Sequence, residues 1–479
     1  MLNIDLFPFL SCFHEGLLEK YEAFRRKQLI KFLSTVDPSL LEKKGEVLAL
    51  RSFQNAARSV PYYKKLLHSR GVEPKSIKTI NDFRKLPILD KKIFQECEIT
   101  DLTLNGSIKN AKNVLTSSGF SGIFSFGVNL PQNLENTARL IDTVLDYGLR
   151  IGDKKALGIN CLPMGVRIRS NLMTLAEVGV REDMALALIR RFHKYFKQIV
   201  VFGEAFFLKH LVEEGINAGI LWKELGVSLV IGGDGFPESY RNYMGGLLGI
   251  SHDKLPMARI IISSLGIAEI DLNLFHETPE TILIRRLAEK NEEFKKELFG
   301  KDTDTVPMLF QYYPHRTFLE TVNEELIITT TYEPCAIPLI RYNTGDRGKI
   351  IPYQIIQDLL QRYQRESLLP QLKLPLVMVQ SRHSDAPKEN RLGNLTRHLI
   401  FSDPEVAKRL TGYFIITREN KIPTVHLQLE KYYSTAEGAH EIRQRLAIPN
   451  ADIKIVPYYE MREALTLNYE KKFRHFSNV

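Results

Sequence analysis

The stretch Val114-Leu-Thr-Ser-Ser-Gly-Phe-Ser-Gly122 passes from a short apolar run into a loop of serines and glycines. Val114 to Ser117 has the composition of a strand. In the loop that follows, glycine permits close approach of the backbone to a ligand, and hydroxyl and backbone N–H groups can together bind a phosphate. The loop is not a Walker loop, because G-x-x-x-x-G-K-[ST] occurs nowhere in the chain. Taken alone, such a stretch is also compatible with an ordinary turn.

The segments around this stretch indicate an alternating architecture. Residues 15–70 carry charged and apolar side chains at helical spacing. Beyond residue 113, short β-rich runs alternate with amphipathic helices, and Asn133 to Gly148 has the clearest apolar face. Strands are predicted over 157–162, 199–202, 227–231 and 259–263, each followed by a turn. This alternation predicts an α/β fold in which helices flank a sheet.

The pattern changes in the second half of the chain. Runs at 308–312, 326–331 and 339–342 follow one another closely and predict a more antiparallel β-subdomain, and 353–367 predicts a polar helix. The polar segment 381–394 predicts a loop, beyond which the chain is long enough for a small separate domain. We therefore predict a large N-terminal domain over 1–380 and a small mobile α+β domain over 381–479.

The composition excludes several classes of protein. The chain has 479 residues, 44% hydrophobic and 25% charged, which is ordinary for a soluble globular protein of two or three domains. No apolar run is long enough to span a membrane, and no basic residue precedes the apolar run near residue 8. The four cysteines are scattered, which is typical of a reducing compartment. We expect a cytoplasmic protein without a membrane partner.

The net charge of +9 does not by itself indicate a nucleic-acid partner. The basic residues form only short clusters with acidic residues nearby, which is typical of a solvated surface. A positive field also attracts anionic small molecules such as nucleotides. We therefore expect no nucleic-acid partner.

Three further motifs each follow or end a predicted strand. The glycines of Ile231-Gly-Gly-Asp-Gly-Phe-Pro-Glu238 could let a flat base lie against the backbone. In Ser263-Ser-Leu-Gly-Ile-Ala-Glu269, the terminal glutamate could bind a hard cation such as Mg²⁺. In Pro338-Leu-Ile-Arg-Tyr-Asn-Thr-Gly-Asp346, the aspartate suits the two neighbouring hydroxyls of a ribose. Taken singly, each is weak, and Asp346 could equally cap its own turn.

The order and spacing of the four motifs resemble the nucleotide-binding motifs of the adenylate-forming superfamily of acyl-CoA ligases. The signature Val60-Pro-Tyr-Tyr63, followed by Leu86-Pro-Ile-Leu-Asp-Lys91, resembles the phenylacetate–coenzyme A ligase branch in particular. The likeness runs from about residue 50 to the C-terminus.

The resemblance implies an adenylation domain over 1–380, which binds ATP and the acyl substrate, and a lid domain over 381–479. Within the large domain it assigns one residue to catalysis and Mg²⁺ binding, Glu269. The residues that it implies for nucleotide binding there are Ser117, Ser118, Gly119, Ser121 and Gly122 at the ATP phosphates, Gly233 and Asp234 beside adenine, Gly266 next to the metal-assisting glutamate, and Asp346 at the ribose.

Two segments near the C-terminus complete the resemblance. Ser381-Arg-His-Ser-Asp385 resembles the interdomain hinge, which makes Arg382 a second ribose contact and Asp385 the pivot. Glu470-Lys-Lys-Phe-Arg474 resembles the segment with the adenylation lysine, which is best matched by Lys472, with Lys471 as the alternative. The resemblance implies that Lys472 stabilises charge during adenylation and is then rotated away with the lid.

The sequence also departs from the family pattern. Phe120 replaces a small hydroxyl residue of the phosphate loop, and Ile123-Phe-Ser replaces the usual proline-lysine pair. Leu265 replaces the tyrosine before Gly266, and Ser381 and Lys471 each replace a glycine. These departures indicate a divergent subgroup.

The implied reaction is ATP-dependent activation of a small carboxylic acid, aromatic acids included, followed by transfer to coenzyme A. The implied cofactors and co-substrates are ATP, Mg²⁺ and coenzyme A. Two alternatives stay open: transfer of the acyl group to an amine, a carrier protein or a protein cysteine, and a degenerate homologue that binds nucleotide without turnover. The identity of the acid and a homodimeric state also stay open. Phe120, Phe236 and Leu265 are candidates for an apolar acyl pocket.

Overall fold

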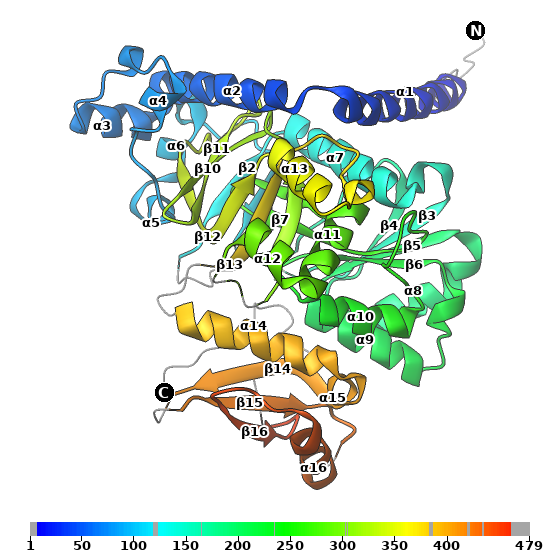
Figure 1. Ribbon diagram of the computed structural model, residues 1–479. Coiled ribbons are helices and arrows are strands. Elements are labelled where there is room, and N and C mark those ends of the chain that lie inside the picture. Colours follow the sequence, from blue (N-terminus) through cyan, green and yellow to red (C-terminus); the bar gives the residue numbers. More distant parts are fainter. Residues whose placement is uncertain are drawn as a thin grey trace.

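The computed structural model describes residues 7–117, 123–163, 165–233, 235–301, 303, 305–382, 387–418, 422–433 and 435–460, without the side chains of 7–16, 18, 381–390 and 435–438. Eleven strands of this part of the chain form one large sheet (Figure 1). Their order across the sheet is β10-β11-β12-β13-β9-β8-β7-β6-β5-β3-β4.

One half of the large sheet is parallel. Its strands are β3 (Ala156–Asn160), β4 (Met173–Glu177), β5 (Gln198–Gly203), β6 (Val227–Ile231) and β7 (Ile261–Ile267). Along β5, Ile199 and Val201 belong to one buried cluster and Val200 and Phe202 to another. Both faces of the strand are therefore covered, which explains its continuous apolar sequence. The α/β fold class and the four strands expected in this region are confirmed.

The other half is antiparallel and continues the same sheet. Its strands are β8 (Asp271–His276), β9 (Met308–Tyr312), β10 (Thr317–Val322), β11 (Glu325–Thr330), β12 (Tyr342–Ile351) and β13 (Leu376–Arg382). The expectation of a distinct β-subdomain is wrong, because β8 pairs with β7 on one side and β9 on the other. The switch from parallel to antiparallel pairing was visible in sequence spacing, but the continuity of the sheet was not.

The strand expected over 339–342 is also wrong. β12 begins only at Tyr342, because Arg341 has φ +50° and interrupts the extended backbone. Leu339 instead accepts a hydrogen bond from the Thr330 backbone at 2.9 Å and donates to the Thr330 hydroxyl at 3.0 Å. A buried loop of apolar residues thus imitates a strand in the sequence.

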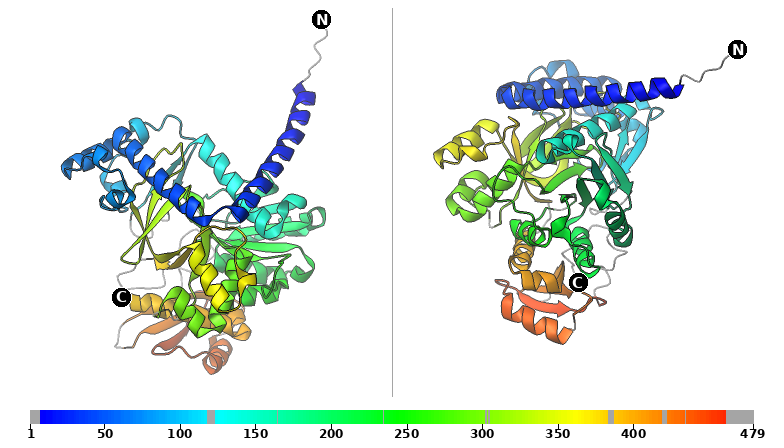
Figure 2. Two further views of the ribbon diagram at one scale, coloured as in Figure 1. Left: turned by 45° about the horizontal axis from the view of Figure 1, so that its top comes forward. Right: turned by 90° about the vertical axis from the view of Figure 1, so that its right-hand side faces the viewer.

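Helices flank both faces of the sheet (Figures 1 and 2). They are α7 (Pro131–Leu149), α8 (Glu182–Phe192), α9 (Ala205–Asn217), α10 (Glu238–Leu248), α11 (Pro279–Lys290), α12 (Glu292–Phe299) and α13 (Tyr353–Arg362). α13 is shorter than the helix expected over 353–367, because Gln364 has φ +55°. A short 3-10 turn, Glu366–Leu368, then leads toward β13.

The N-terminal region is helical, as expected. α1 (Phe7–Thr35) and α2 (Pro38–Ser59) run along one side of the molecule, and Figure 2 shows α1 extending away from it. The shorter helices are α3 (Pro61–Ser69), α4 (Ile80–Phe83), α5 (Ile93–Glu96) and α6 (Ile99–Leu102). The hairpin of β1 (Asn113–Thr116) and β2 (Phe126–Asn129) then flanks the serine and glycine loop. No helix of the described segments is long and apolar enough to cross a bilayer.

A smaller C-terminal unit, residues 387–460, carries its own three-stranded sheet (Figure 1). Its elements are α14 (Pro387–Ser402), α15 (Pro404–Arg409), β14 (Leu410–Thr417), β15 (Thr424–Leu429), α16 (Thr435–Arg445) and β16 (Asp452–Val456). The loop expected over 381–394 is wrong, since β13 ends at Arg382 and α14 begins at Pro387. The polar start of α14 hid this helix, which packs on α10 and β14 through its later residues.

Candidate active site

A large cavity opens beside the carboxyl ends of β5, β6 and β7, where open α/β sheets commonly bind ligands. Its volume is about 180 Å³. Five of the residues expected at the nucleotide lie in its wall: Ser117, Gly233, Gly266, Glu269 and Asp346. They come from five separate places in the chain, namely the end of β1, the loop after β6, β7, the β7–β8 turn and β12. The fold therefore brings together residues that lie as far apart in the sequence as Ser117 and Asp346.

Glu269 is buried in the β7–β8 turn and is held by Tyr342, the first residue of β12. The Tyr342 hydroxyl donates to Glu269 Oε1 at 2.6 Å. Burial and the neighbouring Glu269 carboxylate raise the pKa of Tyr342, so the phenol keeps its proton and stays a donor. The hydrogen bond fixes the carboxylate at the cavity wall.

The β1–β2 hairpin contacts the same turn. A Cβ atom at Gly127 of β2 would collide with the carbonyl oxygen of Ala268, so glycine is needed for this approach. Ser117 closes the base of the serine and glycine loop, because its backbone N–H donates to Ser125 O and its hydroxyl accepts from Ser125 N, both at 2.9 Å. The loop residues Ser118, Gly119, Phe120, Ser121 and Gly122 lie outside the described residues.

Asp346 lies within β12 rather than after its end. Its backbone N–H donates to the Thr344 hydroxyl at 3.1 Å, and Gly345 has φ +75°. The turn expected from Thr-Gly is therefore a local irregularity inside a strand. Arg382 is the cross-strand neighbour of Asp346 in the β12–β13 pair. The two residues expected at a ribose thus come from adjacent strands.

Gly233 needs to be glycine at its position after β6. It has φ +94°, and a Cβ atom there would lie 2.9 Å from Glu204 Oε1. Gly266 lies in β7 at the register shift between Leu265 and Ile267. The neighbouring Asp234, like Asp385, Lys471 and Lys472, lies outside the described residues.

The rest of the cavity wall is mostly apolar and was missed from the sequence. Its apolar side chains come from α7, the segment after β3, and β5, β6, β7 and β8: Ile141, Val144, Leu145, Leu162, Val166, Ile168, Phe202, Val230, Ile262 and Leu272. The helical apolar face predicted over 133–148 was a partial signal, because three of these residues belong to it. Lys91, from the N-terminal signature, also lines the cavity.

Of the residues expected in an apolar acyl pocket, the two described ones lie elsewhere. Neither Phe236 nor Leu265 lines the large cavity in the described part of the chain. The ring of Phe236 instead contacts the guanidinium groups of Arg241 and Arg285, at 4.9 and 5.9 Å from its centroid. These arginines form buried ion pairs with Glu238 and Glu277. Phe236 therefore packs against a structural charge network.

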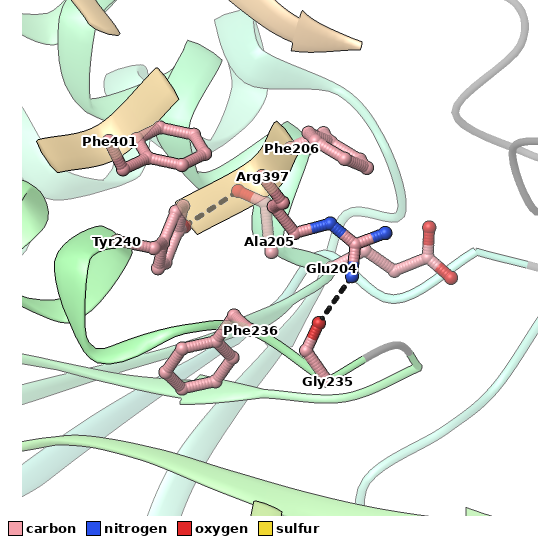
Figure 3. Close-up of a pocket in the computed structure, with 8 residues that line it drawn as sticks. All are labelled: Glu204, Ala205, Phe206, Gly235, Phe236, Tyr240, Arg397 and Phe401. Atoms are coloured by element: carbon pink, nitrogen blue, oxygen red, sulfur yellow. Dashed lines mark hydrogen bonds between the residues drawn. The ribbon is translucent and has the colours of Figure 1, made fainter. Parts of the chain in front are cut away.

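A second, smaller cavity of about 10 Å³ lies between the large domain and α14 (Figure 3). Arg397 of α14 reaches across and donates to Gly235 O at 2.9 Å, next to the segment expected beside adenine. The Tyr240 hydroxyl donates to Ala205 O at 2.7 Å in the same wall. Glu204 lines both cavities, so the C-terminal unit contacts the loop that borders the large cavity.

The described residues contain no cluster of three or more histidine, cysteine, aspartate or glutamate side chains that could hold a metal ion alone. Glu269 is nevertheless suited to Mg²⁺, which proteins commonly bind through one or two carboxylates together with substrate phosphates and water. A single fixed carboxylate in a cavity fits this mode of binding.

The molecule is thus an α/β protein with a cavity beside the carboxyl ends of the parallel strands and with a smaller C-terminal unit. The sequence matches no protein-family model and no curated protein. Among solved structures, 2-hydroxyisobutyryl-CoA ligase in the postadenylation state, in complex with R3-HIB-AMP, has a TM-score of 0.64 at 12% identity, over 94% of this chain and 92% of that one. The same ligase in the thioesterification state, with 2-HIB-AMP and CoA, has a TM-score of 0.55 at 13% identity, over 94% and 91%.

The chain therefore shares the fold of 2-hydroxyisobutyryl-CoA ligase over nearly its whole length. This confirms the fold expected from the motif resemblance, including the smaller C-terminal domain. The narrower resemblance to the phenylacetate–coenzyme A ligase branch stays a prediction, as does the domain boundary between residues 380 and 381.

Proposed function

We propose that this protein uses ATP to convert a small carboxylic acid into an acyl-adenylate and then transfers the acyl group to coenzyme A. The single observation that carries the proposal is the shared cavity of Ser117, Gly233, Gly266, Glu269 and Asp346. They belong to four separate sequence motifs. The fold shared with 2-hydroxyisobutyryl-CoA ligase supports the same proposal.

In the proposed complex, ATP lies along the carboxyl ends of the parallel strands. The Asp346 carboxylate accepts hydrogen bonds from the ribose hydroxyls, with Arg382 contributing from the neighbouring strand. The adenine lies against the backbone around Gly233 and Asp234. The serine and glycine loop that starts at Ser117 binds the phosphates.

The proposed chemistry requires two anions to approach one another, because the substrate carboxylate attacks the α-phosphate of ATP. Glu269, oriented by Tyr342, is the residue that would hold Mg²⁺ together with the phosphates. The bound Mg²⁺ would neutralise phosphate charge. Lys472 supplies the second positive charge, at the carboxylate and the α-phosphate. Pyrophosphate then leaves, and attack by a thiol expels AMP from the acyl-adenylate.

The apolar part of the cavity is the proposed acyl site. Its aliphatic side chains, such as Ile141, Val144 and Val230, suit a hydrocarbon chain or ring of modest size.

The proposed reaction has two half-reactions, and we infer that the present conformation belongs to the first. The TM-score is higher for the postadenylation state of 2-hydroxyisobutyryl-CoA ligase, 0.64, than for its thioesterification state, 0.55. The second half-reaction then requires the C-terminal unit to rotate. Coenzyme A as the acceptor, a homodimer and a cytoplasmic location remain predictions.

The experiment is pyrophosphate release from ATP and Mg²⁺, screened over small aliphatic, hydroxylated and aromatic acids. Each acid that causes pyrophosphate release is then incubated with enzyme, ATP and one of three acceptors: coenzyme A, an amine or a carrier protein. Mass spectrometry detects the thioester or amide product. Glu269→Gln, which should be much slower, is the matched control. Nucleotide binding without release of pyrophosphate from ATP in the presence of any tested acid would instead favour the non-catalytic alternative. The departures at Phe120 and Leu265 point to that alternative.

A further inference from the structure

The apolar wall of the large cavity contains polar side chains that the nucleotide assignment does not use. Asn273 and His276 both belong to β8 and line the cavity. They are only 5% and 1% exposed, respectively. Ser264, on the neighbouring strand β7, lines it as well. A wholly hydrocarbon ligand would give these side chains nothing to bind.

The hydrogen bonds of Asn273 leave its amide nitrogen unsatisfied. The Ser264 hydroxyl donates to Asn273 Oδ1 at 2.9 Å and thereby fixes the orientation of the amide. Asn273 Nδ2 is buried, and no atom in the described part of the chain accepts a hydrogen bond from it. Because buried polar groups in folded proteins nearly always have partners, this N–H₂ group requires an acceptor from another source.

Both ring nitrogens of His276, Nδ1 and Nε2, also lack hydrogen-bond partners among the residues that the structure describes. Burial lowers the pKa of His276 to about 3, so the ring is neutral and presents one donor and one acceptor. Its ring stacks on Tyr313, with centroids 5.3 Å apart and planes 27° apart, which restricts how it can turn.

We propose that the acid activated by this protein carries a polar group on its acyl part, a hydroxyl or a carbonyl oxygen, which binds Asn273 and His276. The oxygen accepts from Asn273 Nδ2, and His276 accepts from a hydroxyl or donates to a carbonyl. This inference rests on the proposed function and narrows its substrate class from small acids to oxygen-substituted ones. Asn273 and His276 are specificity-determining residues in this proposal, and neither takes part in the chemical step.

The test compares pairs of acids that differ only by hydroxyl against methyl, in straight-chain and aromatic series. The readout is kcat/KM for pyrophosphate release, measured with wild-type protein. The hydroxyl member of at least one pair should be favoured roughly 10- to 100-fold, because the methyl analogue leaves a buried donor or acceptor without its partner. This comparison needs no variant and therefore does not depend on whether a variant folds.

Variants then test which residues cause the preference for the hydroxyl acid over the methyl acid. Asn273→Leu and His276→Phe should each reduce the hydroxyl-to-methyl ratio about tenfold or more, mainly through the hydroxyl member. Ile262→Val in the same cavity is the matched control, and it should change both members of a pair alike. Nucleotide affinity, measured by calorimetry, should be the same in all three variants.

Each outcome separates this inference from the proposed function. Equal use of both members of every pair, or preference for the methyl member, overturns the inference and leaves the proposed function standing, and water then occupies the polar positions. An unchanged ratio in both variants also overturns it. If no tested acid leads to pyrophosphate release from ATP, the proposed function and this inference are overturned together.

Discussion

Lys209 of α9 and Glu430, the residue after β15, form a 3.3 Å ion pair across the contact between the large domain and the C-terminal unit. The Lys209 side chain is fully buried, and it also pairs with Glu213 on its own helix at 2.6 Å. Burial alone would lower the pKa of Lys209, but the two carboxylates outweigh it and raise the pKa. The ammonium therefore stays charged, and it holds the C-terminal unit in its present orientation.

Glu430→Gln should loosen this contact. Leaving a buried charge without any partner typically lowers the free energy of unfolding by ~3–5 kcal/mol. Because Lys209 keeps its ion pair with Glu213, we expect a smaller loss of about 1–3 kcal/mol. Amide hydrogen exchange in α14 and β14 should become faster. Glu297→Gln is the control, because its partner Arg362 is 63% exposed and such a surface pair contributes at most about 1 kcal/mol. Equal exchange in the two variants would contradict an interdomain role for Lys209.

Asp346→Ala should weaken nucleotide binding. Loss of a charge-assisted acceptor for the ribose costs about 1.5–3 kcal/mol, which corresponds to a roughly 10- to 100-fold higher Kd for ATP. Calorimetry measures the change directly. Asp358→Ala, an exposed position on α13, is the control and should leave the Kd unchanged. An unchanged Kd for the Asp346 variant would contradict the assignment of Asp346 to ribose binding.

Tyr342→Phe tests whether the orientation of Glu269 matters. The variant removes the hydroxyl that donates to Glu269 Oε1 and keeps the buried ring. We expect kcat for adenylation to fall about tenfold and the Mg²⁺ concentration needed for half-maximal rate to rise, because ordering partners of this kind commonly contribute 10- to 100-fold. Glu269→Gln should lose ~10²–10³ in rate. A Tyr342 variant with reduced stability but normal Mg²⁺ dependence would mean that the hydrogen bond is only structural.

The pH dependence of stability should report the buried His276. Its folded-state pKa of about 3 lies below the ordinary value of about 6.5, so the folded state binds fewer protons. The stabilising contribution is complete above the unfolded pKa and is lost as pH falls from about 6.5 toward 3. In this window the free energy of unfolding falls by up to about 1.4 kcal/mol per pH unit for this group. His276→Phe should reduce the slope by that amount, as measured by urea unfolding from pH 6 to 4. The slope will not vanish, because burial also lowers the pKa of His252 to about 3 and that of His315 to about 4.

The residues proposed to bind nucleotide could be picked out in the sequence, because most of them follow predicted strands. Glycines and carboxylates of these motifs line one cavity beside the carboxyl ends of the parallel strands. Asp346 and Arg382 were assigned separately, and the register of β12 and β13 makes them neighbours.

The proposed acyl site could not be predicted, because the residues of its wall look like ordinary apolar core in the sequence. Val230 and Ile262 look like any buried strand residue, and only the way α7 crosses the sheet turns their face into a cavity wall. The prediction for Phe236 was wrong. It was a candidate for the apolar acyl pocket, but its ring packs against the guanidinium groups of Arg241 and Arg285.

The last prediction concerns Lys472, which lies outside the described residues and is assigned by resemblance. If its ammonium stabilises charge only during adenylation, Lys472→Ala should lower the rate of acyl-adenylate formation by ~10²–10³. The same variant, given synthetic acyl-adenylate and coenzyme A, should form thioester at a near-normal rate, because rotation removes the lysine before that step. Lys471→Ala is the matched control, with mild effects on both half-reactions. The reverse behaviour would shift the assignment by one residue, and equal losses in both half-reactions would exclude the rotating lid for this protein.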